Sequence, residues 1–579
     1  MSAQSDESGT APAAPGGSST TAAKSDHRWA GLFVLATALS MIVLDGTIVG
    51  VALPTIIEDL HLDLNDAQWV NASYSVVFAA LLLTAGRLGD RLGRRNLLLV
   101  GVVVFLGGSI LASQADDAGT LIVARLIQGV GGAFVIPATL STVNATFRGK
   151  DRAVAFGIWG AVISGMAAVG PLLGGWLTTS FTWPWIFLVN IPIGIAVIIG
   201  AILVVPETRA HITVPGLDVV GLLTSALGFG AVVFALIEGQ SLGWWTPKAE
   251  LKLFGAVWGT DAPVSPVPVI GAIGVLFLVL FAFWERHRAR IARSALLDLT
   301  LFRVATFRWG NLTAMLVAIG EFGLIFVLPL YLVNILGLTS LGAGVVLATM
   351  AAGAFVSGAM ARHLAAAIGS PRTIVLGLVL EVVGVLAVAL VVTPTVSPWL
   401  IAALLVIYGL GLGLASAQLT GTTLVDVPEE ESGQASATQS TARQLGSALG
   451  TAFIGAALAI GLSTAVPPAL EKVDGVPPAV ATQVADATQQ SAGGTIPQLR
   501  AEGTTSQFGE KTPEVVDALS DGFSDGTRIS LYVAGGFLLL GLLCSLRVVA
   551  ASRREGVDQG GPRPGTSAAP APEPDATAR

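Results

Sequence analysis

The stretch WAGLFVLATALSMIVLDGTIVGVAL, residues 29–53, is apolar along its whole length, and Asp45 is its only charged residue. An α-helix needs about 20 apolar residues to cross the hydrocarbon core of a bilayer, so this stretch predicts a membrane-spanning helix that contains a carboxyl group. The chain of 579 residues is 53% hydrophobic and only 12% charged, whereas a soluble domain usually carries about 25% charged residues. This composition indicates a polytopic helical membrane protein and excludes a soluble enzyme, a secreted disulfide scaffold and a nucleic-acid binder.

Fourteen apolar blocks are each long enough to form a membrane-spanning helix. They cover residues 29–53, 69–90, 96–113, 119–146, 153–179, 183–205, 216–238, 266–285, 304–333, 340–362, 372–393, 398–424, 436–462 and 528–550. The expected fold is all-α, with two six-helix bundles (29–205 and 304–550) and a linker (206–303) that contains two additional helices. Secondary transporters are often built from two such halves with a site between them. The tails, 1–28 and 551–579, are rich in small polar residues, Gly and Pro and are predicted to be disordered.

Charged residues in the connections predict the orientation in the membrane. Alternate connections are basic; they contain Arg87, Arg91, Arg94 and Arg95, then Arg148, Lys150 and Arg152, then Arg286, Arg288, Arg290, Arg293, Arg303 and Arg308. The first connection on the other side contains only acids: Glu58, Asp59, Asp63 and Asp66. Because cytoplasmic loops carry the excess of Lys and Arg, both termini are expected to be cytoplasmic.

Two connections on the outer side are long. Residues 239–265 contain Trp244, Trp245 and Trp258, which suit the membrane interface. Residues 463–527 are polar and acidic, so either disorder or a small extracellular cap fits this segment. Disorder is the favoured interpretation.

The sequence contains none of the common signatures of an enzyme or a metal protein. Cys544 is the only cysteine, and no Cys/His cluster, His-Glu-x-x-His motif or phosphate-binding loop occurs. We therefore expect no catalytic residues, no metal site, no cofactor and no obligate protein partner.

The run Gly86-Arg87-Leu88-Gly89-Asp90-Arg91-Leu92-Gly93-Arg94-Arg95 lies in the connection between the second and third blocks. Glycines permit a tight turn, and the Asp90 carboxylate could cap a helix N-terminus of the other half. The run resembles the signature loop of the major facilitator superfamily. In that family the loop acts as a latch between the halves, so the resemblance implies a gating role for Gly86, Gly89, Asp90, Arg91, Gly93 and Arg94.

Asp45 lies in the run Leu44-Asp45-Gly46-Thr47, which continues to Pro54. A carboxyl group at this depth is costly and is normally functional, and a group that exists in neutral and charged forms is a credible proton carrier. The run resembles the first helix of the fourteen-helix drug:proton antiporters of the EmrB/QacA type. Gly50 stands where that family usually has Asn.

Arg125 and Gln128 belong to the run Ala124-Arg125-Leu126-Ile127-Gln128-Gly129, which resembles the Arg-x-x-Gln-Gly motif of the same family. At 1.5 Å per residue, Asp45 is about 12 Å below Leu53, and Arg125 is about 9 Å below Gly119. The acid and the base are therefore expected at similar depth. Their pairing would favour the charged carboxylate, and their separation would favour its protonation, which provides a physical route to proton coupling.

Gly170-Pro171-Leu172-Leu173-Gly174-Gly175 lies in the fifth block and resembles the motif of exporters in this superfamily. Small residues permit close helix packing, and Pro171 can bend the helix. The upstream glycine of the motif is displaced here, because Met166 occupies its position.

Other polar residues within the apolar blocks are weaker candidates. Glu321 is expected to line the cavity, where it could attract a cationic substrate or bind a second proton. Gln128 and Asn311 are plausible polar contacts in the same cavity. Glu381 is assigned to a supporting helix, and Arg443 is placed near a helix end.

Taken with the resemblance, these residues predict a proton-coupled exporter that acts on amphipathic, cationic drugs by alternating access. The same scaffold could instead export one endogenous metabolite, such as an antibiotic or a lipid. A non-pumping receptor or scaffold is a third alternative, but it would need neither Asp45 nor the loop at 86–95. The composition, rich in Arg, Ala and Gly and poor in Lys, suggests a bacterial inner membrane.

Overall fold

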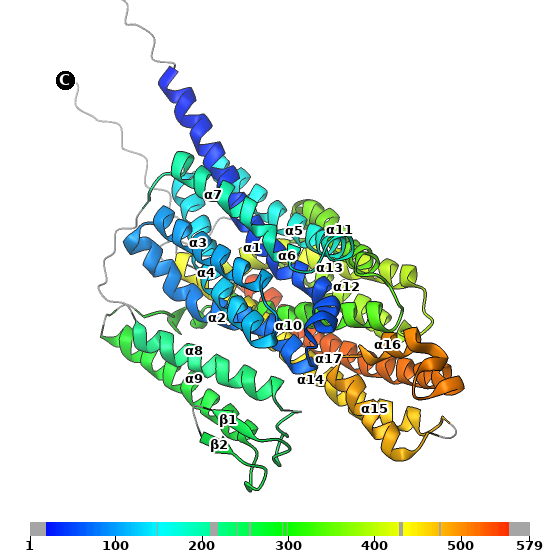
Figure 1. Cartoon of the computed structure of the whole chain (residues 1–579). Coiled ribbons are helices and arrows are strands. Elements are labelled where there is room, and N and C mark those ends of the chain that lie inside the picture. Colours follow the sequence, from blue (N-terminus) through cyan, green and yellow to red (C-terminus); the bar gives the residue numbers. More distant parts are fainter. Residues whose placement is uncertain are drawn as a thin grey trace, which may run out of the picture.

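The computed structural model of the chain describes residues 19–554 apart from 148, 209–217, 240, 254–255, 292, 294, 298, 428–431 and 474–475. Most of these residues lie in long helices that run side by side (Figure 1). The expectation of an all-α polytopic membrane protein is confirmed, except that Leu251–Leu253 and Ala256–Trp258 pair as two short antiparallel strands.

The first bundle contains the helices that carry Asp45 and Arg125. It consists of α1 (Ser19–Leu60), α2 (Leu64–Leu92), α3 (Arg94–Ser113), α4 (Ala118–Thr146), α5 (Gly149–Ser180), the single turn α6 (Trp185–Leu188) and α7 (Asn190–Val204). Pro54, Pro137 and Pro171 lie inside α1, α4 and α5. They are tolerated in membrane helices because neighbouring groups can satisfy the freed backbone carbonyls.

The second bundle begins after the short 3-10 helix η1 (Leu299–Arg303). It consists of α10 (Ala305–Asn334), α11 (Ser340–Ile368), α12 (Ser370–Val391), α13 (Pro398–Leu424), α14 (Ser432–Leu470) and α17 (Thr512–Arg554). Among the described residues, twelve helices are long and apolar enough to cross a membrane. The other two long helices, α2 and α5, have 29 and 32 residues, so every predicted block corresponds to a helix.

The linker forms a helix pair beside the two bundles (Figure 1). The pair is α8 (Val219–Ile237) and α9 (Pro266–Arg290), and the strands β1 (Leu251–Leu253) and β2 (Ala256–Trp258) lie between them. Val233 and Ile237 of α8 share a small apolar cluster with residues of α2 and α14. The Glu238 carboxylate at the end of α8 accepts a hydrogen bond from Trp69 Nε1 at 2.9 Å. The pair therefore packs over the junction between the two bundles.

The segment between α14 and α17 is folded, so the preference for disorder at 463–527 is wrong. It forms α15 (Pro478–Gln490) and α16 (Thr495–Glu502), followed by two short 3-10 helices, η3 (Gly503–Thr505) and η4 (Gly509–Lys511). Ala481, Val484 and Ile496 are buried in the main apolar core. Asn334 Nδ2 donates to the Ala492 carbonyl at 2.9 Å. These contacts attach a small cap to the end of α10.

The segments predicted to be disordered, 1–28 and 551–579, each overlap a helix. Residues 19–28 already belong to α1, and α17 continues to Arg554. Residues 1–18 and 555–579 lie outside the described residues. We call the end of the molecule where α1 begins and α17 ends the tail end, and the opposite end, where α15 and α16 lie, the cap end (Figure 1).

The two bundles share one apolar core towards the cap end. This core includes residues 48–57 of α1 together with residues of α10, α14 and α17. Towards the tail end, the first bundle has a separate core that includes Leu32, Leu97, Phe147 and Val205. Hydrogen bonds also join the bundles towards the cap end: Thr55 Oγ1 and Ser340 Oγ lie 2.9 Å apart, and Ser75 Oγ and Ser447 Oγ 3.1 Å apart. The cap end is therefore closed in this conformation.

Candidate functional site

Asp45 and Arg125 form a fully buried ion pair in the first bundle. Arg125 Nη1 donates to Asp45 Oδ2 at 2.6 Å, and neither side chain is more than 2% exposed. Asp45 lies near the middle of the span Arg28–Leu60. The ion pair joins α1 to α4, which agrees with the similar depths expected from the sequence.

Three amides and one hydroxyl group complete the surroundings of this pair. Gln128 Nε2 donates to Asp45 Oδ1 at 3.0 Å and to Ser109 Oγ at 2.9 Å, while its Oε1 accepts from Arg125 Nη1 at 2.9 Å. Asn190 Nδ2 donates to Asp45 Oδ1 at 3.1 Å. Arg125 Nε donates to the Val70 carbonyl at 3.2 Å. Both Asp45 oxygens are therefore hydrogen-bonded, as a charged carboxylate in an apolar medium requires.

Gln128 is fully buried in this network, so its side chain does not line a cavity in this conformation. Sequence reasoning missed Ser109, Asn190 and Tyr74. The Arg125 guanidinium lies 4.5 Å from the centroid of the Tyr74 ring, at a distance that gives a cation–π attraction. Asn190 is a polar residue at the start of an apolar helix, α7, and this was the one available signal for its role.

Asp117 caps the N-terminus of α4, the helix that carries Arg125. Its carboxylate accepts from the Thr120 hydroxyl at 2.7 Å and from the Thr120 backbone N–H at 3.0 Å. These hydrogen bonds stabilise the charged form and hold the pKa of Asp117 below its usual value. The cap satisfies one of the backbone donors that are free at a helix start.

A second set of charged residues occupies the second bundle. Arg443 Nη2 donates to Glu321 Oε2 at 3.0 Å and to Glu321 Oε1 at 3.3 Å. The Glu321 side chain is 10% exposed and that of Arg443 is 43% exposed. Arg443 was expected near a helix end. It lies instead on α14 where that helix packs against the middle of α10, so the expectation is wrong.

Glu381, Tyr408 and Asn311 are also buried in this bundle. Glu381 and Tyr408 are fully buried, and among the described residues neither Glu381 oxygen nor the Tyr408 hydroxyl has a hydrogen-bond partner. Asn311 Nδ2 donates to the Phe307 carbonyl of its own helix at 2.8 Å, and its Oδ1 has no partner among these residues. The cavity role predicted for Asn311 and Glu321 stays a prediction.

The loop at 86–95 differs from the expected three-glycine turn. Gly86 and Gly89 are helical residues of α2, and the turn is made by Gly93 alone. Gly93 has φ of 104°, a backbone conformation that favours glycine. A Cβ at this position would also lie 2.5 Å from a Glu207 carboxylate oxygen. The chain therefore reverses where the Glu207 side chain packs against it.

The loop is held to its own bundle by several hydrogen bonds. Arg94 Nη1 donates to the Ser141 carbonyl of α4 at 2.9 Å. The Arg95 backbone N–H donates to Glu207 Oε1 at 3.3 Å. The side chain of Asp90 lies outside the described residues, so its predicted contact with the other half stays a prediction, as do the roles of Arg91 and its neighbours.

The motif Gly170–Gly175 brings α5 into contact with one helix of each bundle. Gly170 and Gly174 face α1, where a Cβ on Gly174 would lie 2.8 Å from the Ile48 carbonyl oxygen. Gly175 faces α11, where a Cβ would lie 2.5 Å from the Ser340 carbonyl oxygen. Gly344 of α11 is packed against the Pro171 carbonyl. The small residues of this motif therefore allow the two bundles to approach closely towards the cap end.

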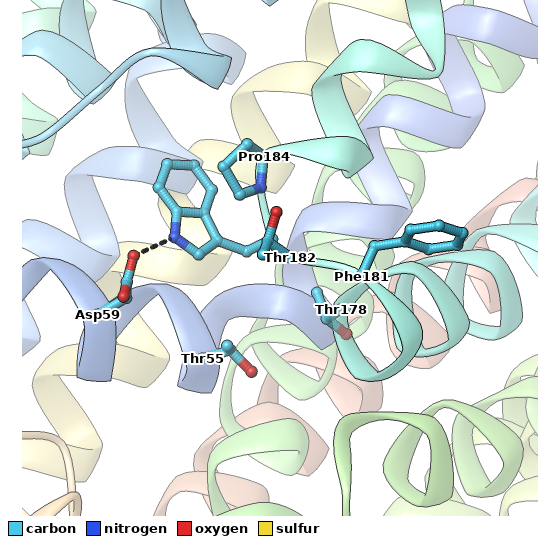
Figure 2. A pocket seen from close by; sticks show the side chains of 7 residues that line it. Thr55, Asp59, Thr178, Phe181, Thr182 and Pro184 are labelled. Atoms are coloured by element: carbon cyan, nitrogen blue, oxygen red, sulfur yellow. Dashed lines mark hydrogen bonds between the residues drawn. The ribbon is translucent and has the colours of Figure 1, made fainter.

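A pocket of about 330 Å³ opens near this contact, where α1 and α5 end (Figure 2). It is lined by Thr55, Asp59, Thr178, Phe181, Thr182, Trp183 and Pro184. Trp183 Nε1 donates to Asp59 Oδ2 at 2.6 Å. Asp59 is fourteen residues beyond Asp45 on α1, or about 21 Å along the helix, so this pocket is separate from the buried ion pair.

No metal centre is evident in the part of the chain that the structure describes. No group of three or more His, Cys, Asp or Glu side chains in that part is positioned to hold a metal ion. The chemistry available at the site is that of acids, amides and one guanidinium group. Such groups can bind and release protons or attract charged solutes.

Comparison with known proteins gives consistent results. The model of the Major Facilitator Superfamily matches residues 35–451. The chain is 33% identical over 440 residues to a protein of Streptomyces coelicolor described as a probable actinorhodin transporter, a match that covers 74% of this chain and 72% of the relative. It is 31% identical over 520 residues to the multidrug resistance protein Stp of Mycobacterium tuberculosis, with 89% of this chain and 91% of the relative covered.

A solved structure has the same fold. It is a bacterial homolog of the human lysosomal transporter Spinster, in an inward-facing and unoccupied conformation. The TM-score is 0.58 at 18% sequence identity, and the alignment covers 91% of this chain and 98% of that chain. At this identity the similarity shows the fold alone.

Proposed function

This chain belongs to the major facilitator superfamily, and from that premise we propose that it is a proton-coupled exporter of amphipathic, cationic drugs. The observation that carries the proposal is the buried network of Asp45, Arg125, Gln128 and Asn190 at the middle of the membrane span. A carboxyl group there is expensive to bury. A proton carrier needs a carboxyl group of this kind, and Asp45 can act as one if Arg125 can move away from it.

The proposed cycle couples the protonation of Asp45 to the reorientation of the bundles. In the conformation described above, the cap end is closed and Asp45 is paired with Arg125. Substrate binding would open the close contact of Gly175 with Ser340 and Leu341, so that substrate can leave at the cap end. A proton that enters from the open cap end then protonates Asp45, which keeps it separated from Arg125 and favours the return to the closed conformation. There the proton is released towards the tail end and the ion pair forms again, so each cycle moves a proton inward and substrate outward.

The direction of export depends on the orientation in the membrane. Basic connections lie at the tail end and acidic ones at the cap end, which supports a cytoplasmic position for both termini. The cap at 478–502 would then be extracellular. In this arrangement the inward proton gradient supplies the energy for efflux across the plasma membrane.

The substrate class follows from the charge of the second bundle and from the relatives. Glu321 lies at the middle of α10 with a small exposed fraction and can attract a cation when Arg443 moves away. One relative is described as a multidrug resistance protein, which supports a broad range of compounds. An exporter dedicated to one endogenous metabolite is not the function we favour.

The test is dye efflux from cells that express the wild type, Asp45→Asn or the control Asp486→Asn, each with and without a protonophore. Asp486 is an exposed residue of the cap helix α15, so its substitution repeats the chemical change away from the bundles. We expect efflux in the wild type and in Asp486→Asn, and none in Asp45→Asn or in uncoupled cells.

Efflux by Asp45→Asn that still collapses with the protonophore would refute the role of Asp45. Efflux by the wild type that persists with the protonophore would refute proton coupling. No wild-type efflux of any cationic dye, with the protein confirmed in the membrane, would contradict the substrate class.

A further inference from the structure

Glu381 is a buried acid that the proposed cycle does not use. It is the middle residue of α12, eleven residues after Ser370 and ten before Val391. Its side chain is fully buried, and among the described residues neither carboxyl oxygen has a hydrogen-bond partner. An unpaired carboxylate in such a place would cost several kcal/mol, on the order of the penalty for any uncompensated buried ion. The group is therefore neutral, and holds a proton, in this conformation.

The neighbouring helix α13 leaves space for the Glu381 side chain. On α13, Gly411 lies directly opposite, where a Cβ would be 3.0 Å from Glu381 Cγ and 2.6 Å from the Glu381 backbone nitrogen. Tyr408, also on α13, is fully buried, and its hydroxyl has no hydrogen-bond partner among the described residues. An apolar side chain would fill this site without the loss of about 1–3 kcal/mol that an unsatisfied buried polar group brings. A purely structural role therefore does not explain an acid here.

The charged groups within electrostatic reach of Glu381 are Glu321 on α10 and Arg443 on α14. The other packed helices carry their charges at their ends. Arg528 of α17 donates to the carbonyl of Val392, beyond the end of α12, and Arg362 and His363 lie near the end of α11. The relevant partners of Glu381 are therefore the two members of the neighbouring ion pair.

The Arg443 side chain is held loosely compared with Arg125. It is 43% exposed and contacts Glu321 through Nη2 alone, at 3.0 and 3.3 Å. The Glu321 carboxylate is only 10% exposed and needs a counter-ion, but the partly exposed Arg443 can be replaced in that role by another cation. A cation that binds to Glu321 can therefore displace Arg443.

We propose that Glu381 is a second proton-binding site, whose proton is exchanged for a substrate cation bound at Glu321. When the cation pairs with Glu321, Arg443 is released and becomes the counter-ion of Glu381. The O–H bond of Glu381 then breaks, the proton passes to water, and the electron pair stays on the carboxylate. This inference rests on the proposed function, since it requires a cationic substrate and proton exchange.

The exchange keeps the cluster neutral at both stages. Before it, neutral Glu381, anionic Glu321 and cationic Arg443 sum to zero. After it, two carboxylates are balanced by Arg443 and the substrate cation. No uncompensated charge is created in the membrane interior, where it would be most costly.

The first test is infrared spectroscopy of the purified protein, with tetraphenylphosphonium as the probe cation. The C=O stretch of a protonated carboxylic acid reports the Glu381 proton directly. We expect the wild type to lose this band when the probe is added. Glu381→Gln and Glu381→Met should lack the probe-sensitive band, while Glu471→Gln, at an exposed position before the cap, should keep it.

The second test is the accumulation of the probe in proteoliposomes as a function of an imposed pH gradient. Loss of one exchanged proton lowers the accumulation ratio about tenfold for a gradient of one pH unit, because one pH unit per proton corresponds to a tenfold change in an equilibrium constant. We expect this reduction in Glu381→Gln and in Glu381→Met, and none in Glu471→Gln. The Met variant removes the acid without introducing an unpaired amide, so it provides the test if the Gln variant does not fold.

The inference is overturned if both Glu381 variants exchange as many protons per substrate as the wild type, or if the probe leaves the wild-type band unchanged. Either result would leave the proposed proton-coupled export itself intact. A wild type that moves no protons with the probe at all would contradict proton-coupled export itself.

Discussion

The two bundles place charged residues at the same depth but bond them very differently. In the first bundle, Asp45 and Arg125 are buried, and both Asp45 oxygens are hydrogen-bonded. In the second, Arg443 is half-exposed, and the buried Glu381 is without a hydrogen-bond partner among the described residues. A buried acid in a membrane protein can therefore be stabilised by an ion pair, as in Asp45, or by protonation, as in Glu381. Only the ion pair holds the neighbouring side chains in one geometry.

The corresponding helices of the two bundles show the same difference in hydrogen bonding. Asp45 and Glu321 both lie on the first helix of a bundle, and Ser109 and Glu381 both lie on the third. Ser109 accepts a hydrogen bond from Gln128 of the fourth helix at 2.9 Å. Tyr408 of the corresponding helix makes no such bond within the described part of the chain. Both oxygens of Asp45 are therefore bonded to neighbouring side chains, whereas neither oxygen of Glu381 is bonded to any of the described residues.

The largest expected effect comes from removal of the arginine in each bundle. Arg125→Gln leaves the Asp45 carboxylate buried without its cation and should destabilise the protein by about 3–5 kcal/mol. Arg443→Gln removes a partner that is 43% exposed, so water can reach the Glu321 carboxylate more easily than that of Asp45, and the loss should be smaller than in Arg125→Gln. Reversible unfolding of the two purified variants in SDS, compared with the wild type, measures both values. Equal losses in the free energy of unfolding would contradict the difference between the two bundles.

A smaller effect is expected from the neutral partners of the two acids. Asn190→Leu removes a donor to Asp45 Oδ1 and should cost about 1–3 kcal/mol, because a buried acceptor loses a bond. Tyr408→Phe removes a buried hydroxyl that has no hydrogen-bond partner among the described residues, so it should not lower the free energy of unfolding and should raise it by up to about 1–3 kcal/mol. The same SDS titration serves here. A loss in Tyr408→Phe as large as in Asn190→Leu would show that the hydroxyl is bonded in the membrane.

The smallest expected effect concerns the starts of the two fourth helices. Asp117 caps α4, whereas Ser397 makes no capping bond to α13. Asp117→Ala should lower the melting temperature slightly at pH 7, and Ser397→Ala should leave it unchanged.

The pH dependence of the Asp117 effect has a definite sign. The pKa of Asp117 is lower in the folded protein than in the unfolded chain. Its stabilisation is therefore fully present above the unfolded value and is lost as the pH falls through the folded value. The gap in melting temperature between the wild type and Asp117→Ala should close in that acidic range, and a gap that is constant with pH would contradict the assigned cause.

Much of the fold could be predicted because each membrane helix is determined by its own stretch of sequence. Each apolar block must satisfy its own backbone hydrogen bonds in lipid, so each forms a helix whatever its neighbours are. Disorder was preferred to a folded cap for the opposite reason. Residues 478–502 are polar overall, and a few apolar side chains such as Val484 and Ile496 become ordered only because the ends of the bundle offer them a surface.

The candidate site was predictable where depth alone decides the contact. Asp45 and Arg125 lie at similar distances from the same membrane face, and helix rise converts this into proximity. Arg443 could not be placed in this way, because its partner Glu321 depends on how α14 packs against α10. The turn at Gly93 was likewise shifted from the expected three-glycine turn, since Gly86 and Gly89 continue the helix α2.

The sequence by itself determined the helical membrane architecture, the resemblance to the drug:proton antiporters and the pairing of Asp45 with Arg125. All three follow from local composition, short motifs and the fixed rise of a helix. Only the tertiary structure decided that the cap is folded, that Arg443 meets Glu321 and that Glu381 is enclosed without a partner among the described residues. These features depend on helix rotation and on contacts between segments far apart in the chain, and no periodicity in the sequence records which face of a uniformly apolar helix meets which neighbour.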